Sequence, residues 1–446
     1  MAYYPNTDED RREMLDAIGV KNFEELIKDI PREIRLKNDL KISPAMSEFE
    51  VVKHLSSLAK ENINAQEAVS FLGAGVYDHF VPSAVTAMLG RSEFYTAYTP
   101  YQAEVSQGTL QSIYEYQTMI CRLTGMDVSN ASLYDAGSAL AEAALMSVSH
   151  TGRKKIVAAH PIHPHYLKVV KTYVHGQGFE LVEVPQRDGV VDIDALKQTV
   201  DYGTAAVMVQ QPSFFGTLSD VFEIGEVAHS KKALYVVDVN PISLGALVPP
   251  GEYGADVVVG EGQPLGIPQS LGGPFLGIFA VKEALIRRIP GRLAGVTVDT
   301  DGNRGFVLTL QTREQQIRRE KATSNICTNE GLVMLAATIY VSLMGKEGIR
   351  EVAEQSSAKA HYLGEQIENI PGYALKYPQP FFNEFLLSTR VPAEKIIGSG
   401  IDKKFLAGVD VEKLLPSENG LLVAVTEKRT KEEMDGFAQF LRTVSK

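Results

Sequence analysis

Short apolar runs alternate with helical patterns through the middle of the chain. The apolar runs, which are rich in β-branched residues, lie at 155–158, 180–184, 205–209, 234–237, 256–259 and 274–280. Between them, apolar positions recur at helical spacing over residues 139–148, 166–175, 193–200 and 221–230. This alternation predicts repeated βα units, and therefore a mostly parallel sheet with right-handed crossovers and helices on both faces.

The two ends of the chain have different patterns, so we predict three parts. Residues 1–62 have apolar positions at helical spacing and no strand pattern, which predicts a helical arm. Residues 63–325 hold the alternating pattern and form the predicted large α/β domain. After it, residues 326–446 contain a long apolar helix at about 330–344 and apolar runs at 373–377, 381–387 and 420–425, which predict a smaller α+β domain.

Composition narrows the choice of partners. The chain of 446 residues has 44 basic and 55 acidic residues, and its net charge of −11 argues against non-specific binding to nucleic acid or to anionic membranes. The longest apolar runs are too short to span a membrane. The N-terminal residues have no signal pattern and the two cysteines, Cys121 and Cys327, are far apart, so we expect a reducing cytoplasm. Small molecules and proteins are the expected partners.

Two motifs suggest a pocket for an anion or a cofactor. Gly137 and Ser138 follow Asp135 where a strong helix-forming sequence begins, and free backbone N–H groups at a helix start bind anions. A plain helix cap explains the same residues equally well. Asp238 ends a buried strand pattern, where a carboxylate can pair with a protonated ring nitrogen. Each motif alone is a weak signal, because helix caps and strand-end aspartates are common.

The order of these motifs is more specific. A Gly-Ser helix start, a strand ending in a histidine and a strand ending in an aspartate follow one another as in pyridoxal phosphate enzymes of fold type I. The order therefore predicts the aspartate aminotransferase-like fold. It also predicts a cofactor pocket formed by Gly137, Ser138, His160 and Asp238, which we call the relic pocket because the lysine of such sites is missing.

The lysine that this fold requires is missing. An amine that reaches the cofactor should follow Asp238 by about one strand. The chain has Gln263 and Pro264 in that region, and no lysine lies between Lys232 and Lys282. We therefore predict that this chain does not bind pyridoxal phosphate covalently. The alternative is a self-sufficient lyase that uses an unexpected lysine such as Lys282.

Several long irregular motifs resemble one family, the P-protein of the glycine cleavage system. They are SFLGAGVYDHFVP at 70–82, FYTAYTPYQAE at 94–104, SQG at 106–108, QPLGIP at 263–268, GGPFLG at 272–277 and RREKATSNICTN at 318–329. The resemblance covers nearly the whole chain. In that family two homologous halves form one long chain or two subunits, and the half with the lysine holds the cofactor. This chain looks like the other half.

The resemblance implies a reaction and a set of partners. A lysine-bearing partner subunit would bind pyridoxal phosphate, and the pair would decarboxylate glycine, with the cofactor ring as electron sink. The aminomethyl group would then pass to the lipoyl arm of the H-protein, with release of carbon dioxide. Pairing of homologous folds implies an αβ unit that dimerises to α₂β₂. The alternative is a structural or regulatory subunit that touches no substrate.

The resemblance also implies roles for two segments. One carries Tyr95, Tyr98, Tyr101, Gln102 and Glu104, a loop that would hold the glycine carboxylate or shape the lipoyl tunnel of the shared site. Structural tyrosines in a subunit interface are the alternative. The other carries Thr323, Ser324 and Asn325, which would bind the phosphate of the partner's cofactor. An N-cap for the helix that includes residues 329–344 explains this segment about as well.

Three histidines, a cysteine and two glycine-rich segments have simpler explanations. His160, His163 and His165 have the spacing HxxHxH, but no carboxylate or cysteine completes a metal set, so we expect no metal and regard His160 as a relic ring stacker. Cys327 is expected to be a buried small apolar residue rather than a redox-sensitive thiol. LGAGVYDH and SLGGPFLG lack the phosphate-loop lysine and predict tight turns.

Overall fold

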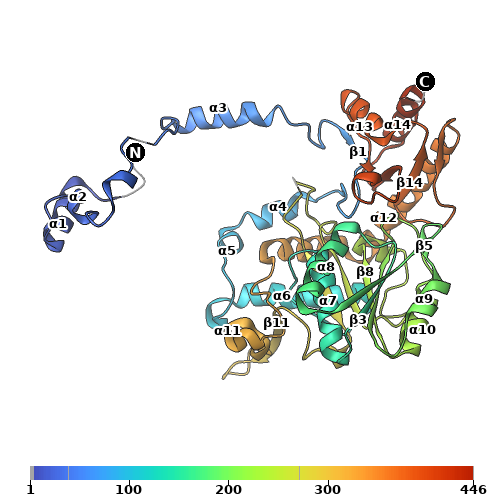
Figure 1. The fold of residues 1–446 in the computed structure, drawn as a ribbon, viewed down its shortest axis with the longest axis horizontal. Coiled ribbons are helices and arrows are strands. Elements are labelled where there is room, and N and C mark those ends of the chain that lie inside the picture. The colour runs from blue at the N-terminus through green and yellow to red at the C-terminus, as the bar shows by residue number, and fades with distance from the viewer. Residues whose placement is uncertain (1–4, 39, 271, 445–446) are drawn as a thin grey trace. The chain divides into compact units, whose positions relative to one another are not determined.

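The computed structural model describes residues 5–38, 40–270 and 272–444, and the chain divides into two compact units. The glycine-rich segment SLGGPFLG includes residue 271, which lies outside the described residues. The first unit, Met1–Ile63, holds α1 (Asp8–Ile18), α2 (Phe23–Leu26), η1 (Arg32–Ile34) and α3 (Glu48–Ala59) (Figure 1). Capping boxes begin α1 and α3, and none of these helices buries a residue.

The second unit, Asn64–Lys446, contains a seven-stranded sheet. Its strand order is β2-β10-β9-β8-β7-β3-β4, and the strands from β4 to β9 in this order are parallel. β10 is antiparallel to β9 and β2 is antiparallel to β10. The strands are β2 (Val128–Ser129), β3 (Lys155–Ala159), β4 (Glu180–Val184), β7 (Thr204–Gln211), β8 (Leu234–Val239), β9 (Val257–Glu261) and β10 (Gly277–Val281). The predicted mostly parallel sheet is confirmed.

Helices cover both faces of this sheet, which explains why its strands read as continuous apolar runs. Alternate strand residues face opposite sides: Val157 and Val207 pack with one set of helices, whereas Ile156 and Ala206 pack with the other. The first face is covered by α6 (Gln107–Thr124), α9 (Ile193–Thr199), α10 (Val221–Ser230) and the start of α12 (Gly331–Glu368). The second is covered by α7 (Ala136–Thr151) and α8 (Pro164–Gln177).

Helix α12 joins this core to a second, smaller one. The sequence predicts a helix ending near residue 344, and the helix is indeed interrupted at Gly345, whose φ is 57° and ψ −173°, before it continues to Glu368. Met334 and Tyr340 pack in the core of the large sheet, while Leu363 and Ile367 pack in the smaller core. α12 is also the one helix of the described chain that has the length and apolar character of a membrane span, and 44% of its apolar window is buried inside the protein.

The smaller core lies around a four-stranded sheet of order β13-β14-β17-β16. It is formed by β13 (Tyr373–Leu375), β14 (Glu384–Thr389), β16 (Val409–Asp410), β17 (Leu421–Ala424), α13 (Ala393–Asp402) and α14 (Lys431–Val444). β1 (Val69–Ser70) pairs in parallel with β15 (Phe405–Leu406), so the residues after the first unit return to the C-terminal part. The predicted boundary between a large and a small domain at 325/326 stays a prediction.

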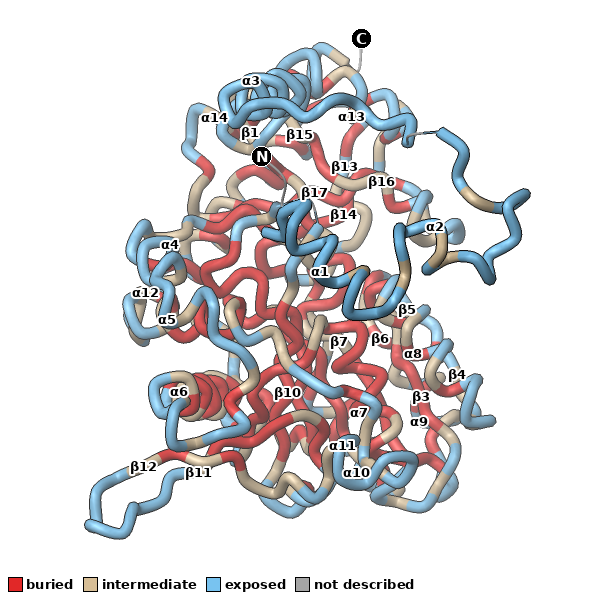
Figure 2. The backbone as a smooth tube through the Cα atoms, turned by 90° about the vertical axis from the view of Figure 1, so that its left-hand side faces the viewer, coloured by how far each residue is buried: buried red, intermediate tan, exposed pale blue. Residues whose placement is uncertain are grey.

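The remaining elements lie mainly at the surface. They are α4 (Ser83–Leu89), α5 (Ser92–Tyr95), η2 (Ala103–Val105), β5 (Gln186–Arg187), β6 (Val190–Val191), η3 (Pro241–Gly245), η4 (Glu283–Leu285), β11 (Leu293–Val298), β12 (Arg304–Thr309), η5 (Gln311–Arg313), α11 (Gln315–Arg318), η6 (Arg319–Lys321) and η7 (Val411–Lys413). The tip of the β11–β12 hairpin is exposed, whereas the large sheet is buried (Figure 2).

Candidate functional site

Helix α7 begins at the carboxyl edge of the large sheet, and side chains of the chain itself accept hydrogen bonds from two of its first N–H groups. Asp135 Oδ1 accepts a hydrogen bond from Ser138 N at 2.7 Å, and Ser138 Oγ accepts one from Asp135 N at 3.2 Å, a reciprocal capping box. Ala136 N donates to Glu261 Oε2 at 3.2 Å. An added Cβ on Gly137 would lie 3.3 Å from Val169 Cγ2, so α8 packs closely against this turn. Ser138 therefore takes part in a helix cap, as the alternative explanation of this motif predicts.

Two buried carboxyl groups end neighbouring strands. Asp238, on β8, is 2% exposed, and among the described residues its Oδ1 has no hydrogen-bond partner. Burial, together with nearby Glu261, raises the pKa of Asp238 well above its ordinary value. Glu261, at the end of β9, accepts from Gln263 N at 3.1 Å and from Leu276 N at 2.9 Å. Burial raises its pKa to about 8, against these backbone hydrogen bonds.

Gln263, near the expected lysine position, is fully buried and holds a loop over the sheet edge. Its Oε1 accepts from Tyr77 N at 2.9 Å, and its Nε2 donates to Tyr77 O at 3.0 Å and to Ile267 O at 2.7 Å. The Tyr77 hydroxyl donates to Glu384 Oε2 at 2.8 Å, and Ala74 N donates to Glu384 Oε1 at 2.7 Å. The LGAGVYDH motif is therefore a buried loop fixed from two sides.

The histidine that faces this loop is His163 rather than the predicted His160. The His160 ring bonds Glu183 on β4 at 2.9 Å, whereas Asp238 lies on β8, on the other side of β3 and β7. The His160 side chain thus turns toward β4, away from Asp238, and its role as a relic ring stacker stays a prediction. His163 stacks on Tyr166 at 4.2 Å between ring centroids, and its Nε2 bonds the Ala74 carbonyl at 2.9 Å.

Lys282 cannot replace the missing lysine. It follows β10, whose last residue, Val281, pairs with Val257 at the start of β9. Its ammonium donates to Asp256 Oδ1 at 3.0 Å and to the Gly254 carbonyl at 3.1 Å. Lys282 therefore lies at the amino edge of the parallel strands, opposite the edge at which β9 ends in Glu261, so this lysine cannot serve a self-sufficient lyase.

The tyrosine loop opens into a cavity. Tyr95 and Tyr98 line a space of about 190 Å³, together with Thr109 of α6 and with Thr328 and Asn329 before α12. Their side chains are 68% and 85% exposed, respectively. Gln102 and Glu104 are exposed and do not line this cavity. The structure thus brings part of the predicted loop next to Thr328 and Asn329, a few residues beyond the second predicted segment, Thr323–Asn325.

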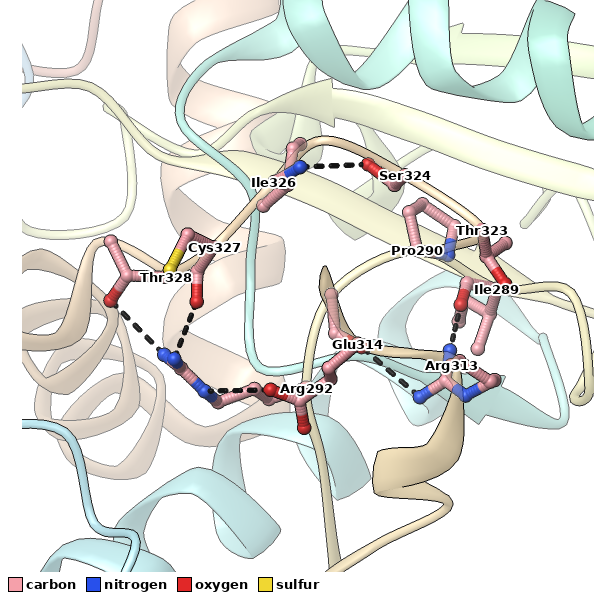
Figure 3. A pocket seen from close by; sticks show the side chains of 11 residues that line it. Ile289, Pro290, Arg292, Arg313, Glu314, Thr323, Ser324, Ile326, Cys327 and Thr328 are labelled. Carbon is pink, nitrogen blue, oxygen red and sulfur yellow. Dashed lines mark hydrogen bonds and ion pairs between the residues drawn. The ribbon is translucent and has the colours of Figure 1, made fainter. Parts of the chain in front are cut away.

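Arg292, which the sequence reasoning missed, ties the tyrosine loop to the stretch Cys327–Thr328. Its guanidinium donates to Thr328 Oγ1 at 3.0 Å and to the Cys327 carbonyl (Figure 3). It also donates to the Tyr101 hydroxyl at 2.9 Å. Its Nε lies 3.6 Å from Glu314 Oε2, and only 2% of the arginine side chain is exposed. A single arginine in an irregular stretch has no periodic signal, so only the fold reveals its role.

Thr323 and Ser324 border a second, small cavity that is also lined by Arg292 and Arg313 (Figure 3). Thr323 and Asn325 are exposed, while Ser324 Oγ accepts from Ile326 N at 3.0 Å. α12 begins only at Gly331 and has no side-chain cap, so the N-cap explanation of this segment is wrong. Thr323 lies at the surface of this chain, where it can contact another molecule.

Glu142, on α7, lies behind this segment and was also missed. It is 2% exposed, and burial raises its pKa to about 7, while a hydrogen bond from Ser324 acts in the opposite direction. Cys327 is exposed, so the prediction of a buried small residue is wrong, because its segment lies on the surface. Among the described residues no group of three or more histidine, cysteine, aspartate or glutamate side chains is placed to hold a metal ion.

Comparison with known proteins gives a consistent result. Residues 1–441 match the family described as glycine cleavage system P-protein. A protein from Chlorobium phaeobacteroides named probable glycine dehydrogenase (decarboxylating) subunit 1 is 58% identical over 442 residues, 99% of each chain. The crystal structure of a glycine decarboxylase (P-protein) of the glycine cleavage system, in inhibitor-bound form, covers 100% of both chains with a TM-score of 0.91 and 42% identity.

A more distant structure supports the fold alone. The sphingosine-1-phosphate lyase of Burkholderia pseudomallei is 15% identical, with a TM-score of 0.68 over 92% of this chain and 93% of its own. Together with the similarities above, it confirms the predicted fold of the pyridoxal phosphate-dependent transferases of fold type I.

Proposed function

Because the chain belongs to the glycine cleavage system P-protein family, we propose that it is the lysine-less subunit of a two-subunit glycine decarboxylase. With a lysine-bearing subunit 2 it decarboxylates glycine and passes the aminomethyl group to the lipoyl arm of the H-protein, releasing carbon dioxide. The observation that carries the proposal is Gln263, a fully buried amide near the position where this fold places its lysine.

The cofactor of this fold fits poorly at the start of α7 in this chain, so we assign it to the partner subunit. The start of α7 is taken by Asp135 and Glu261, and Gln263 has no amine to offer. When bound by the partner, pyridoxal phosphate supplies the electron sink that decarboxylation needs. In the proposed assembly, an α₂β₂ tetramer in the cytoplasm, this chain forms the opposing wall of the site.

The surface around Arg292 is the part of the chain that we assign to the shared site. The phenols of Tyr95 and Tyr98 are exposed, and phenols donate hydrogen bonds to carboxylates, so they suit the glycine carboxylate or the lipoyl tunnel. Thr323 and Asn325 offer a hydroxyl and an amide to the partner's cofactor phosphate. Arg292 ties the tyrosine loop to the stretch Cys327–Thr328.

Reconstitution tests this division of labour. The chain, its subunit 2 and lipoylated H-protein are assayed for glycine-dependent exchange of carbon dioxide, together and singly. We expect exchange only when both subunits are present. Exchange by this chain alone contradicts the proposal.

The same assay distinguishes a purely structural subunit. Thr323→Ala and Tyr98→Phe remove single hydroxyls from the exposed surface and leave the buried core intact. A shared active site requires lower exchange activity in complexes that assemble normally. Unchanged activity in both variants favours a scaffold that touches no substrate.

A further inference from the structure

Backbone donors converge where α7 begins, beside the ends of β8 and β9. Three backbone N–H groups, of Ala136, Gln263 and Leu276, converge on one carboxyl group, that of Glu261. Such a convergence at a helix start is how proteins bind external anions. Here the acceptor is the carboxyl group of a side chain of the chain itself.

A second observation points to a ligand that the chain has lost. Asp238 is 2% exposed, and among the described residues its Oδ1 has no hydrogen-bond partner. A buried, unpaired carboxyl oxygen costs free energy, which makes it unusual in a purely structural position. It occupies the strand end at which this fold pairs a carboxylate with a ring nitrogen. This part of the chain thus has an unpaired acceptor, Asp238, and a set of backbone donors that its own Glu261 carboxyl group occupies.

Two phenols pack around the loop that Gln263 holds. The Tyr77 hydroxyl donates to Glu384 Oε2 at 2.8 Å, and the Tyr166 ring stacks on His163 at 4.2 Å between ring centroids. A Cβ on Gly75 would lie 2.6 Å from the Tyr166 hydroxyl, which shows how tightly the loop packs there. Gln263 and Glu384 fix this loop through Tyr77.

We infer that the relic pocket is sealed from within: Glu261 takes the place of the cofactor phosphate at the start of α7, and the Gly73–His79 loop takes the place of the ring. The seal makes this chain unable to bind pyridoxal phosphate even non-covalently in its own crevice. The inference rests on the proposed function in one respect: the seal explains why the partner subunit holds the cofactor. The group that would otherwise bind at the start of α7 is an anion, a carboxylate or a phosphate.

Anion rescue of the full chain tests the inference. Glu261→Ala removes the carboxyl group of Glu261. Its three backbone donors then face a small space into which formate fits. Glu261→Gln is the matched control, because its amide fills the same volume and its single oxygen can still accept the two hydrogen bonds from Gln263 N and Leu276 N. Thermal unfolding is followed in sodium formate and in sodium chloride of equal ionic strength.

We expect formate to bind Glu261→Ala about tenfold more tightly than the wild type or Glu261→Gln, as one charge-assisted hydrogen-bonded site implies. Saturating formate should raise the Tm of that variant by about 2 °C relative to chloride and leave the other two unchanged. An equal response of all three proteins overturns the inference. Glu261→Ala leaves three backbone donors unpaired. Glu261→Ser keeps one acceptor oxygen for them and is therefore measured in parallel.

A crystal structure of the wild-type chain grown in phosphate gives an answer that does not depend on any variant folding. We expect the Glu261 carboxyl group on Ala136 N and no phosphate there. Phosphate at Ala136 N, with Glu261 turned away, overturns the inference. Neither experiment contains glycine or subunit 2, so a failed seal and a failed catalytic proposal give different results.

Discussion

Replacing Arg292 is the sharpest test of how the proposed shared surface is held together. Arg292→Met removes three hydrogen bonds, to Tyr101, Thr328 and the Cys327 carbonyl, and leaves Glu314 without its cation at 3.6 Å. The arginine and glutamate side chains are only 2% and 9% exposed, so solvent replaces little of what is lost. Breaking one side of a buried ion pair costs roughly 3–5 kcal/mol, so we expect a loss of about 4 kcal/mol in the free energy of unfolding.

Arg292→Lys separates charge from geometry. The ammonium keeps the charge beside Glu314, but a single point donor cannot span Tyr101 and Thr328 in the planar fork of an arginine. We expect a loss of about 2 kcal/mol, because hydrogen bonds to charged groups contribute roughly 1.5–3 kcal/mol each. Urea unfolding at pH 7 measures both variants.

A matched control lies on the same stretch of chain. Arg288 is exposed and donates one hydrogen bond, to Ser149 Oγ at 2.8 Å. Arg288→Met should therefore change the free energy of unfolding by less than about 0.5 kcal/mol. If Arg292→Met proves as stable as Arg288→Met, Arg292 does not hold the tyrosine loop and the stretch Cys327–Thr328 together and the reasoning fails.

Three further predictions follow from the site. In the reconstituted complex, Tyr98→Phe should lower exchange activity about tenfold or more with unchanged stability of the isolated chain, as the loss of one charge-assisted hydrogen bond implies; activity equal to wild type refutes a substrate contact. The raised pKa of Glu142, about 7 against an ordinary 4.5, means that stability is lost as pH rises from about 4.5 to 7, by roughly 3 kcal/mol. Urea unfolding of the Glu142→Gln variant at pH 5 and 7.5 should not show this loss of stability. If wild type and variant change by the same amount between the two pH values, the prediction is contradicted. Cys327 is exposed, so a thiol reagent should label it in the native chain well before the half-buried Cys121, and equal labelling rates count against the described surface.

The sheet was predictable because strands buried on both faces read as apolar runs, and those of β3, β4, β7, β8 and β9 were located within a few residues. The β11–β12 hairpin was not predicted, since its tip is exposed and Val296 and Val298 lack a buried face. The continuation of α12 beyond Gly345 was missed because a glycine in a left-handed conformation normally ends a helix.

The candidate site was less accessible to sequence reasoning. The absence of a lysine near Gln263 is a property of the sequence and needed no structure. The choice between His160 and His163 depends on which way the chain turns after β3, and periodicity carries no information on that turn. Arg292 and Glu261 act through contacts with residues more than 30 positions away, which no local pattern encodes.

The most direct test of the central claim is to locate the cofactor chemically. The complex of this chain with subunit 2 is loaded with pyridoxal phosphate and reduced with borohydride, and the two chains are separated and mapped by mass spectrometry. We predict a reduced pyridoxyl group on one lysine of subunit 2 and none on this chain, Lys282 included. A stoichiometric pyridoxyl-lysine in this chain contradicts the account.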